Sequence, residues 1–392
     1  MNPAFSSFAS PANRLLACCA RTFVSPEIAA RIRQTAATPL DWNTVLDQAN
    51  EHSVVPLLAR NLRFAAPDLI PREAAAQLDA AVRANAIRCL AHTSELVRAV
   101  ELLASRGIRA LPYKGPVIAA QAYQDISARE FEDLDIVLQQ RDIPAADEAI
   151  RSLGYEPRFD WLHKRNGRDV VPGEYKYFQH ARKTILELHT EVTLRHFPVA
   201  APLPEYFERA VTVDLGGKSV QTFRAEDALA VYCIHATKDF WEKLVWVVDI
   251  AELLRTFSDL DWDSVWRQSE RLLAQRMVHL GLALAAGILD AQLPREVRTR
   301  VEADQRAFVL AREIANRLLD RHVPRRTAGQ RFRYRRETVP GLVAGWRYAI
   351  RLTLTPAQDD WEQTERAAPI SRLHRAIRPF RLLRKYGSLR RQ

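Results

Sequence analysis

The chain has 392 residues, of which 47% are hydrophobic and 27% charged, and its formal net charge is +10. This length exceeds a single ordinary core and the composition excludes a fibrous or disordered chain, so we expect two or three globular domains. The four cysteines form no Cys-x-x-Cys pair, so neither a zinc site nor a disulfide framework is indicated, which fits a reducing cytoplasm. No segment fits a signal peptide or a membrane span.

Residues 12–106 are predicted to be almost wholly helical. Asp41 fits an N-cap for a helix that begins at Trp42. A long helix is expected over Ala74–Arg106, where apolar residues recur at helical spacing and Gly107 follows the end. This part of the chain is therefore expected to form an N-terminal helical region, 1–106.

The segment 107–224 has shorter elements that alternate between strands and helices. We expect strands over Ile108–Tyr113 and Glu132–Leu138, helices over Val117–Tyr123 and Ile143–Leu153, and two hairpins, Tyr175–Phe178 with Thr184–His189 and Val211–Val213 with Val220–Phe223. Because no long βαβ repetition is present, the pattern favours a small α+β domain over a doubly wound fold.

Residues 225–392 return to helical periodicity. Helices are expected over Glu226–Lys238, Trp241–Phe257, Trp262–Arg271 and Met277–Leu289, and prolines divide the last stretch into short pieces. The segment Arg381–Arg391 is strongly basic, which is compatible with nucleic acid, anionic lipid or a phosphorylated substrate. An ordinary solvated helix face is the alternative explanation for this charge.

Asp133-Leu134-Asp135 is the motif that carries most chemical information. The following Ile136, Val137 and Leu138 predict a buried strand, so both aspartates share one face of it. Two adjacent carboxylates repel each other unless a cation lies between them, and Mg²⁺ prefers carboxylate oxygens together with substrate phosphates. A lone Asp-x-Asp pair also occurs on solvated strands, but here it follows a strand–glycine–helix unit.

Glu187 is the candidate for a third acid. It alternates with leucines in the strand Thr184–His189, so Glu187 and His189 are expected to share a face, as if this strand lay beside that of Asp133 and Asp135. Glu187 could accept the proton of an attacking group, and His189 could orient a phosphate or tune Glu187. A half-exposed structural strand remains the alternative.

Four further residues are candidates for nucleotide binding. Gly115 would let the backbone approach a phosphate at a helix start, and Lys114 would add a positive charge there. Arg129 could clamp a phosphate or pair with a carboxylate, and Ser127 lies close to it in the sequence. A strand-ending turn with a solvent-exposed lysine would explain the same residues without a ligand.

His235, Trp246 and Asp249 lie in the helical region that follows. Asp249 is surrounded by apolar residues and is expected to be buried, so it needs a partner, for which His235 or a lysine is suitable. A structural polar contact is the favoured interpretation, and a role in a substrate pocket is the alternative.

The order of these motifs resembles the bacterial uncharacterised nucleotidyltransferase family of the DNA polymerase β-like superfamily. The resemblance extends over nearly the whole chain and rests on Lys114-Gly115, Tyr123, Arg129, Asp133-Leu134-Asp135-Ile136-Val137, Leu153-Gly154-Tyr155, Glu187-Leu188-His189, His235, Trp246 and Asp249. It implies an α+β fold, with a small mixed-sheet polymerase β-like core over 107–224 between helical regions over 1–106 and 225–392. It also implies that Asp133, Asp135 and Glu187 are the metal ligands and catalytic residues.

We therefore expect a Mg²⁺-dependent nucleotidyltransferase, with Mn²⁺ as the alternative ion. It would transfer a nucleoside monophosphate, or a related nucleotide-linked group, from a triphosphate such as ATP and release pyrophosphate. The acceptor could be a sugar phosphate, a peptide, a protein or an RNA end. Two other hypotheses are a nucleotide-binding protein without catalysis and a factor whose basic tail makes peripheral contact with a membrane or RNA.

Overall fold

The computed structural model describes residues 10–158, 173–192, 203–320, 323–324, 326–341 and 343–348. The basic segment Arg381–Arg391, and with it the expected membrane or RNA contact, lies outside these residues. Among the helices of the described ranges, none combines the length and the apolar character needed to cross a membrane.

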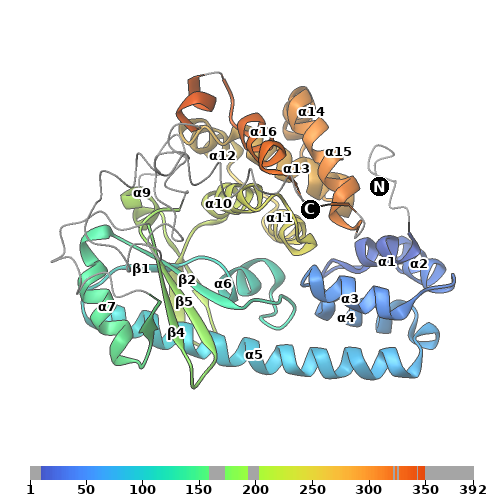
Figure 1. The fold of residues 1–392 in the computed structure, drawn as a ribbon, viewed down its shortest axis with the longest axis horizontal. Helices are drawn as coiled ribbons and strands as arrows, with labels where there is room; N and C mark the ends of the chain where they lie inside the picture. The colour runs from blue at the N-terminus through green and yellow to red at the C-terminus, as the bar shows by residue number, and fades with distance from the viewer. Residues whose placement is uncertain are drawn as a thin grey trace, which may run out of the picture.

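A five-stranded mixed sheet forms the centre of the α+β part (Figure 1). Its strands are β1 (Ala110–Pro112), β2 (Asp133–Leu138), β3 (Glu156–Pro157), β4 (Glu174–Gln179) and β5 (Thr184–His189). They follow the order β1-β2-β5-β4-β3, in which β2 and β5 pair in parallel and the other neighbours are antiparallel. A separate hairpin joins β6 (Val211–Asp214) to β7 (Ser219–Thr222). Both hairpins expected from the sequence are confirmed.

Besides a 3-10 turn over Gln140–Asp142, three short helical elements connect or flank these strands. They are α6 (Pro116–Ile118), which continues as a π-helical turn over Ala119–Tyr123, α7 (Ile143–Ser152) and α9 (Leu203–Glu208). The expected α-helix over Val117–Tyr123 is therefore a single α-helical turn followed by a π-helical one.

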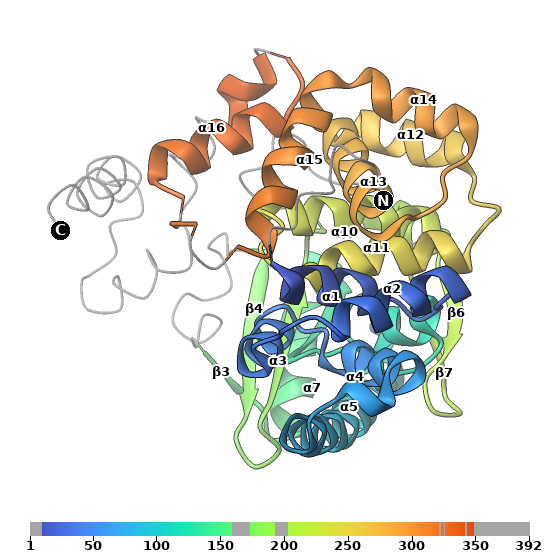
Figure 2. The same ribbon diagram turned by 90° about the vertical axis from the view of Figure 1, so that its right-hand side faces the viewer.

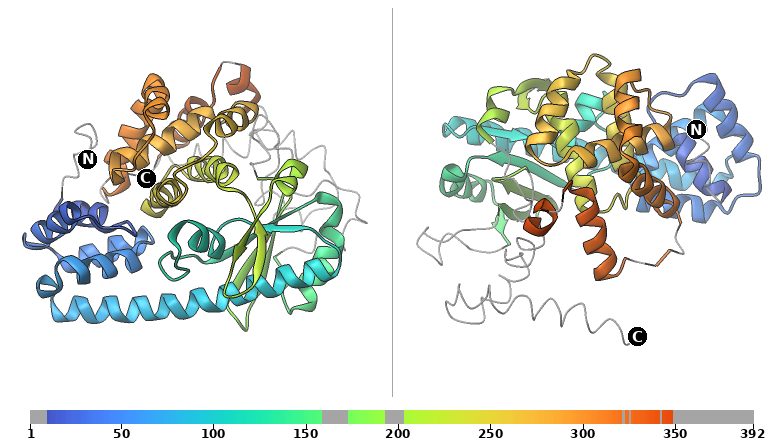
Figure 3. Two further views of the ribbon diagram at one scale, coloured as in Figure 1. Left: turned by 180° about the vertical axis from the view of Figure 1, so that it is seen from behind. Right: turned by 90° about the horizontal axis from the view of Figure 1, so that it is seen from above.

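The helices before the sheet are tied together by one long helix. They are α1 (Pro11–Cys19), α2 (Pro26–Ala36), α3 (Trp42–Glu51), α4 (Val55–Ala65) and α5 (Arg72–Ser105). Asp41 caps α3, as expected, by accepting a hydrogen bond from the amide of Asn43. In Figure 1 and the left view of Figure 3, α5 runs along one side of the molecule, below α3 and α4 at one end and past the sheet at the other. Its 34 residues make it about 50 Å long.

The helices after the sheet stack in a further layer (Figure 2). They are α10 (Ala225–Lys238), α11 (Leu244–Thr256), α12 (Trp262–Arg271), α13 (Gln275–Leu289), α14 (Arg295–Ala303), α15 (Gln305–Leu318) and α16 (Ala328–Thr338). The largest buried cluster includes apolar residues of α1, α4, α10, α11 and α13, so both helical regions share one core. The domain boundaries at 106/107 and 224/225 stay predictions.

The start of α11 corrects the sequence-based expectation. A helix was expected from Trp241, but α11 begins at Leu244. Phe240 and Trp241 have φ angles of 60° and 55°, in the left-handed region that interrupts a helix. The buried Trp241 side chain, whose indole N–H donates to Oγ1 of Thr237, fixes this turn between α10 and α11.

Candidate active site

The candidate acidic residues lie on two neighbouring strands. β2 and β5 pair in parallel with Asp135 opposite Glu187 and Val137 opposite His189. Because side chains alternate along a strand, Asp133, Asp135, Glu187 and His189 project from the same face. The residues that alternate with them, Leu134, Ile136, Leu186 and Leu188, are fully buried. The expectation that these two strands lie side by side is confirmed.

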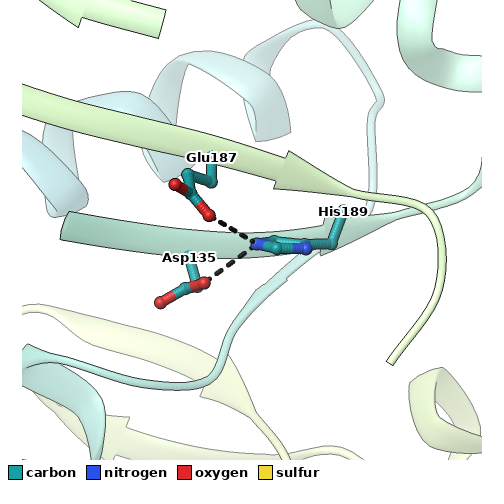
Figure 4. A group of neighbouring side chains, drawn as sticks. All are labelled: Asp135, Glu187 and His189. Carbon is teal, nitrogen blue, oxygen red and sulfur yellow. Dashed lines mark hydrogen bonds and ion pairs between the residues drawn. The ribbon is translucent and has the colours of Figure 1, made fainter. Parts of the chain in front are cut away.

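His189 bridges the two central carboxylates (Figure 4). Its Nε2 lies 2.9 Å from Oδ1 of Asp135 and 3.5 Å from Oε2 of Glu187. All three residues are buried, and one donor atom from each lies within 4.8 Å of the others, an arrangement that could hold a metal ion. Oδ2 of Asp135 is buried and has no hydrogen-bond partner, which leaves a carboxylate oxygen unsatisfied at this point.

Two lysines supply the remaining positive charge. Nζ of Lys114 lies 2.9 Å from Oδ1 of Asp135, and Lys176 forms an ion pair with Glu187. Lys176 is directly opposite Glu187 in the pairing of β4 with β5. Each of the two buried carboxylates therefore contacts one lysine and His189, which offsets the cost of burying its charge.

These contacts shift the pKa values of the cluster. Burial alone would raise the pKa of Asp135, but Lys114 and His189 outweigh it and hold this pKa below its usual range. Burial also opposes the shift at Glu187, whose pKa His189 and Lys176 nevertheless lower to about 2. Bonds to both carboxylates outweigh burial and raise the pKa of His189 to about 9. Burial and the neighbouring Asp135 raise the pKa of Asp133 to about 6.

Gly115 lets the chain pass close to β2. Its φ is 51°, and a Cβ at this position would lie 3.2 Å from the carbonyl oxygen of Asp133. A larger residue would be strained by the backbone angle and crowded by this oxygen. The helix that follows has only three α-helical residues, too few for a strong dipole, so the positive charge at this turn comes from Lys114.

Arg129 and Asp249 form a buried ion pair beside the cluster. Nε and Nη2 of Arg129 donate to the two carboxylate oxygens of Asp249 at 2.7 and 2.8 Å, and the Tyr123 hydroxyl donates to Oδ1 at 2.7 Å. The partner of Asp249 is thus Arg129, and not His235 or a lysine as expected. Ser127 binds Asp125 through its amide and its hydroxyl, and it is not among the residues that line the cavity described next.

A cavity of about 450 Å³ opens in front of the sheet. The strands contribute Asp133, Lys176, Glu187 and His189 to its wall, and Lys114, Gly115 and Arg129 adjoin them. Both helical regions complete it, with Asn50, Ser53, Arg88, His235, Lys238, Lys243 and Trp246. The strands and the flanking helices therefore enclose the acidic cluster jointly.

One wall of the cavity is aromatic. The ring of His235 meets that of Trp246 edge-on, with centroids 5.9 Å apart. Burial, and then the charge of Lys114, lower the pKa of His235 well below its usual range. His235 and Trp246 both line the cavity, whereas Asp249 is not among the lining residues and makes the structural polar contact that the sequence favoured.

Lys176 is the residue of the cluster that sequence reasoning missed. The expected hairpin already contained the necessary signal. Counting residue pairs outward from its turn, His180–Lys183, places Lys176 opposite Glu187.

Comparison with known protein families gives an extended match. The profile of a family described as "Uncharacterised nucleotidyltransferase" matches residues 38–290, more than half of the chain. No curated protein matches the sequence significantly.

Two solved structures show partial similarity. The antibiotic-resistance factor ANT(2'')-Ia has 11% identity and a TM-score of 0.32, with 46% of this chain and 91% of that chain covered. An antigenic nucleotidyltransferase-like protein from Paracoccidioides brasiliensis has 15% identity and a TM-score of 0.30, with 51% and 93% covered. At such low TM-scores, neither structure bears on the function of this chain.

Proposed function

The chain belongs to the uncharacterised nucleotidyltransferase family, and from this premise we propose that it is a divalent-metal-dependent enzyme of the DNA polymerase β-like superfamily. It would transfer a nucleoside monophosphate, or a related nucleotide-linked group, from a triphosphate to an acceptor and release pyrophosphate. The observation that carries this proposal is the alignment of Asp135 with Glu187 across β2 and β5, on the face that also bears Asp133 and opens into the cavity.

The donor set fits a divalent cation. Asp133, Asp135 and Glu187 would hold the ion, since hard cations such as Mg²⁺ bind carboxylate oxygens. The buried Oδ2 of Asp135, which no hydrogen-bond donor satisfies, is a free ligand atom at this point. When bound, such an ion supplies positive charge to the α-phosphate and to the departing pyrophosphate.

The residues of the chain would divide the remaining work. Lys114 lies at the cavity wall and, with Gly115 beside it, would bind the triphosphate tail through charge-assisted hydrogen bonds. The ion pairs of Glu187 and its low pKa favour a role as a charged ligand over the expected role as proton acceptor. Arg129 already binds Asp249 through two hydrogen bonds, so it would fix the wall of the pocket more than clamp a phosphate.

The acceptor would enter from the helical side of the cavity. The residues there combine cations with an aromatic wall, His235 and Trp246, which suits a polar acceptor such as a sugar phosphate, a peptide, a protein or an RNA end. We place the reaction in the cytoplasm, where the four buried free cysteines would remain reduced.

Transfer of an α-phosphate label tests this proposal. Each α-labelled nucleoside triphosphate is incubated with purified protein, Mg²⁺ or Mn²⁺, and fractionated lysate of the source organism. The expected result is a labelled product that requires the metal and that disappears in the double variant Asp133→Ala with Asp135→Ala. Nucleotide binding without any labelled product across all fractions would instead indicate a non-catalytic nucleotide-binding protein. Equal labelling by the wild type and the double variant would refute the site.

A further inference from the structure

The ring nitrogen of His189 occupies a position that a metal ligand could take. Nε2 points at Oδ1 of Asp135 and at Oε2 of Glu187, at 2.9 and 3.5 Å (Figure 4). The three donor atoms come from adjacent strands that are locked in register, so their separation is set by the sheet. The ring is also held from the side by Tyr113, whose ring lies edge-on to it at 5.6 Å.

These separations match those between neighbouring ligands of one ion. In an octahedral site with bonds of about 2.1 Å, adjacent ligand atoms are about 3 Å apart. The distances from Nε2 to the two oxygens are close to this value, and all three atoms lie within 4.8 Å of one another. Because a metal ligand must be deprotonated, binding of the ion would release the Nε2 proton that the two carboxylates favour on His189. The ammonium groups of Lys114 and Lys176 instead approach the carboxylates as counter-ions.

We infer that Nε2 of His189 is a direct ligand of the metal centre, together with Asp135 and Glu187, and that the centre prefers Mn²⁺ or a similar ion over Mg²⁺. Mg²⁺ selects oxygen ligands, whereas an imidazole nitrogen suits first-row transition metals. The inference rests on the proposed function, because it refines the metal site of that reaction. It differs from the all-carboxylate site, Asp133, Asp135 and Glu187, that the sequence predicts.

Pulsed electron paramagnetic resonance of bound Mn²⁺ tests the inference without turnover. The full-length protein is loaded with MnCl₂ alone and, in a second sample, with MnCl₂ and inorganic tripolyphosphate, which contains no nitrogen. A directly coordinated imidazole gives a nitrogen modulation of the Mn²⁺ echo. We expect this modulation in the wild type and its loss in His189→Asn. In the control His235→Asn, which changes another histidine of the same cavity, it should persist.

Competition titrations give a second, independent readout. The ratio of Mg²⁺ to Mn²⁺ dissociation constants should fall by at least about tenfold in His189→Asn, since an oxygen donor replaces the imidazole. Circular dichroism checks that the variant is folded. The echo of the wild-type protein tests the inference even if the variant fails to fold. Wild-type protein that binds Mn²⁺ without nitrogen modulation, or that fails to bind Mn²⁺ under both conditions, would overturn the inference.

The outcome separates this inference from the proposed function. Pyrophosphate release with Mg²⁺ in a protein that shows no nitrogen modulation would sink the inference and leave the function standing. Nitrogen modulation in a protein that transfers no nucleotide to any acceptor would support the inference and refute the proposed function.

Discussion

Arg129 and Asp249, 120 positions apart in the chain, form a buried ion pair with two hydrogen bonds of 2.7 and 2.8 Å. The pair joins the segment before β2 to α11, and therefore connects the strand that carries the aspartates to the helical wall of the cavity. Removal of one partner would leave the other charge buried without compensation.

Asp249→Asn should therefore lower the free energy of unfolding by about 3 kcal/mol or more. Asparagine retains the shape of the side chain but removes the charge that compensates Arg129, and chemical denaturation measures the loss. The matched control is Asp68→Asn, which breaks the exposed pair of Asp68 with Arg33 and should lower the free energy of unfolding far less, because solvent screens this pair. Equal losses of unfolding free energy in the two variants would contradict the claim that burial determines how much the Arg129–Asp249 pair contributes to stability.

Lys114→Met should weaken the use of the triphosphate. Its ammonium group contacts Asp135 and lines the cavity, so its loss removes a charge-assisted hydrogen bond to a phosphate. We expect kcat/KM for the triphosphate to fall about 10- to 100-fold in a pyrophosphate-release assay. Lys218→Met, on the exposed hairpin where Lys218 pairs with Glu101, is the control and should leave the rate unchanged. A Lys114→Met enzyme with the wild-type kcat/KM for the triphosphate would exclude Lys114 from triphosphate binding.

Gly115→Ala should impair both stability and activity. The new Cβ would combine a left-handed backbone with a 3.2 Å approach to the carbonyl oxygen of Asp133. Gly216→Ala isolates the backbone effect, because Gly216 has a φ of 66° and a Cβ there would meet nothing within 4 Å. The control should lose about 1 kcal/mol of stability and no activity. Full activity of Gly115→Ala, as in the control, would contradict the prediction that the close approach of Gly115 to Asp133 matters for catalysis.

The predictable part of the site depends on local pattern and strand pairing. Alternation in β2 and β5 placed Asp133, Asp135, Glu187 and His189 on shared faces, and the hairpin of β4 with β5 follows from its turn. These features are encoded within a few residues of the positions concerned, so sequence reasoning reached them.

Long-range partners and strained turns could not be predicted in this way. Nothing near Asp249 in the sequence identifies Arg129 as its partner, because only the packing of α11 beside the π-helical turn brings them together. The left-handed conformation of Phe240 and Trp241 is likewise held by tertiary packing, since neither residue type favours it. α14, α15 and α16 lie in the region 225–392 that was expected to be helical, but their individual bounds were not predicted.

Asp304 should make stability depend on pH at the acidic end. Burial opposes the shift, but hydrogen bonds from His279 and the Ala307 amide, with the charge of Arg276, lower its pKa from 3.8 to about 2. Because the pKa of Asp304 is lower in the folded state than in the unfolded state, its charge stabilises the protein at pH values above the unfolded-state pKa. This contribution is lost as the pH falls from about 4 towards 2.

Asp304→Asn should therefore destabilise the protein by about 1–2 kcal/mol at pH 7 and by progressively less below pH 4. Asparagine can still cap α15, so the loss reports mainly the charge. Urea denaturation of both proteins at several pH values between 7 and 3 measures the difference. A difference that stays constant over this range would contradict the linkage.

The central claim is that the acids of β2 and β5 support metal-dependent nucleotidyl transfer, and pyrophosphate release by Asp135→Asn tests it most directly. Asparagine keeps the size of the side chain but removes the charge that faces Lys114 and His189. In the presence of the lysate fraction that contains the acceptor and a saturating divalent metal, we predict that the rate of pyrophosphate release falls at least about 100-fold relative to the wild type. The exposed control Asp259→Asn should retain the wild-type rate. Wild-type release by Asp135→Asn, with its fold intact, would contradict the account.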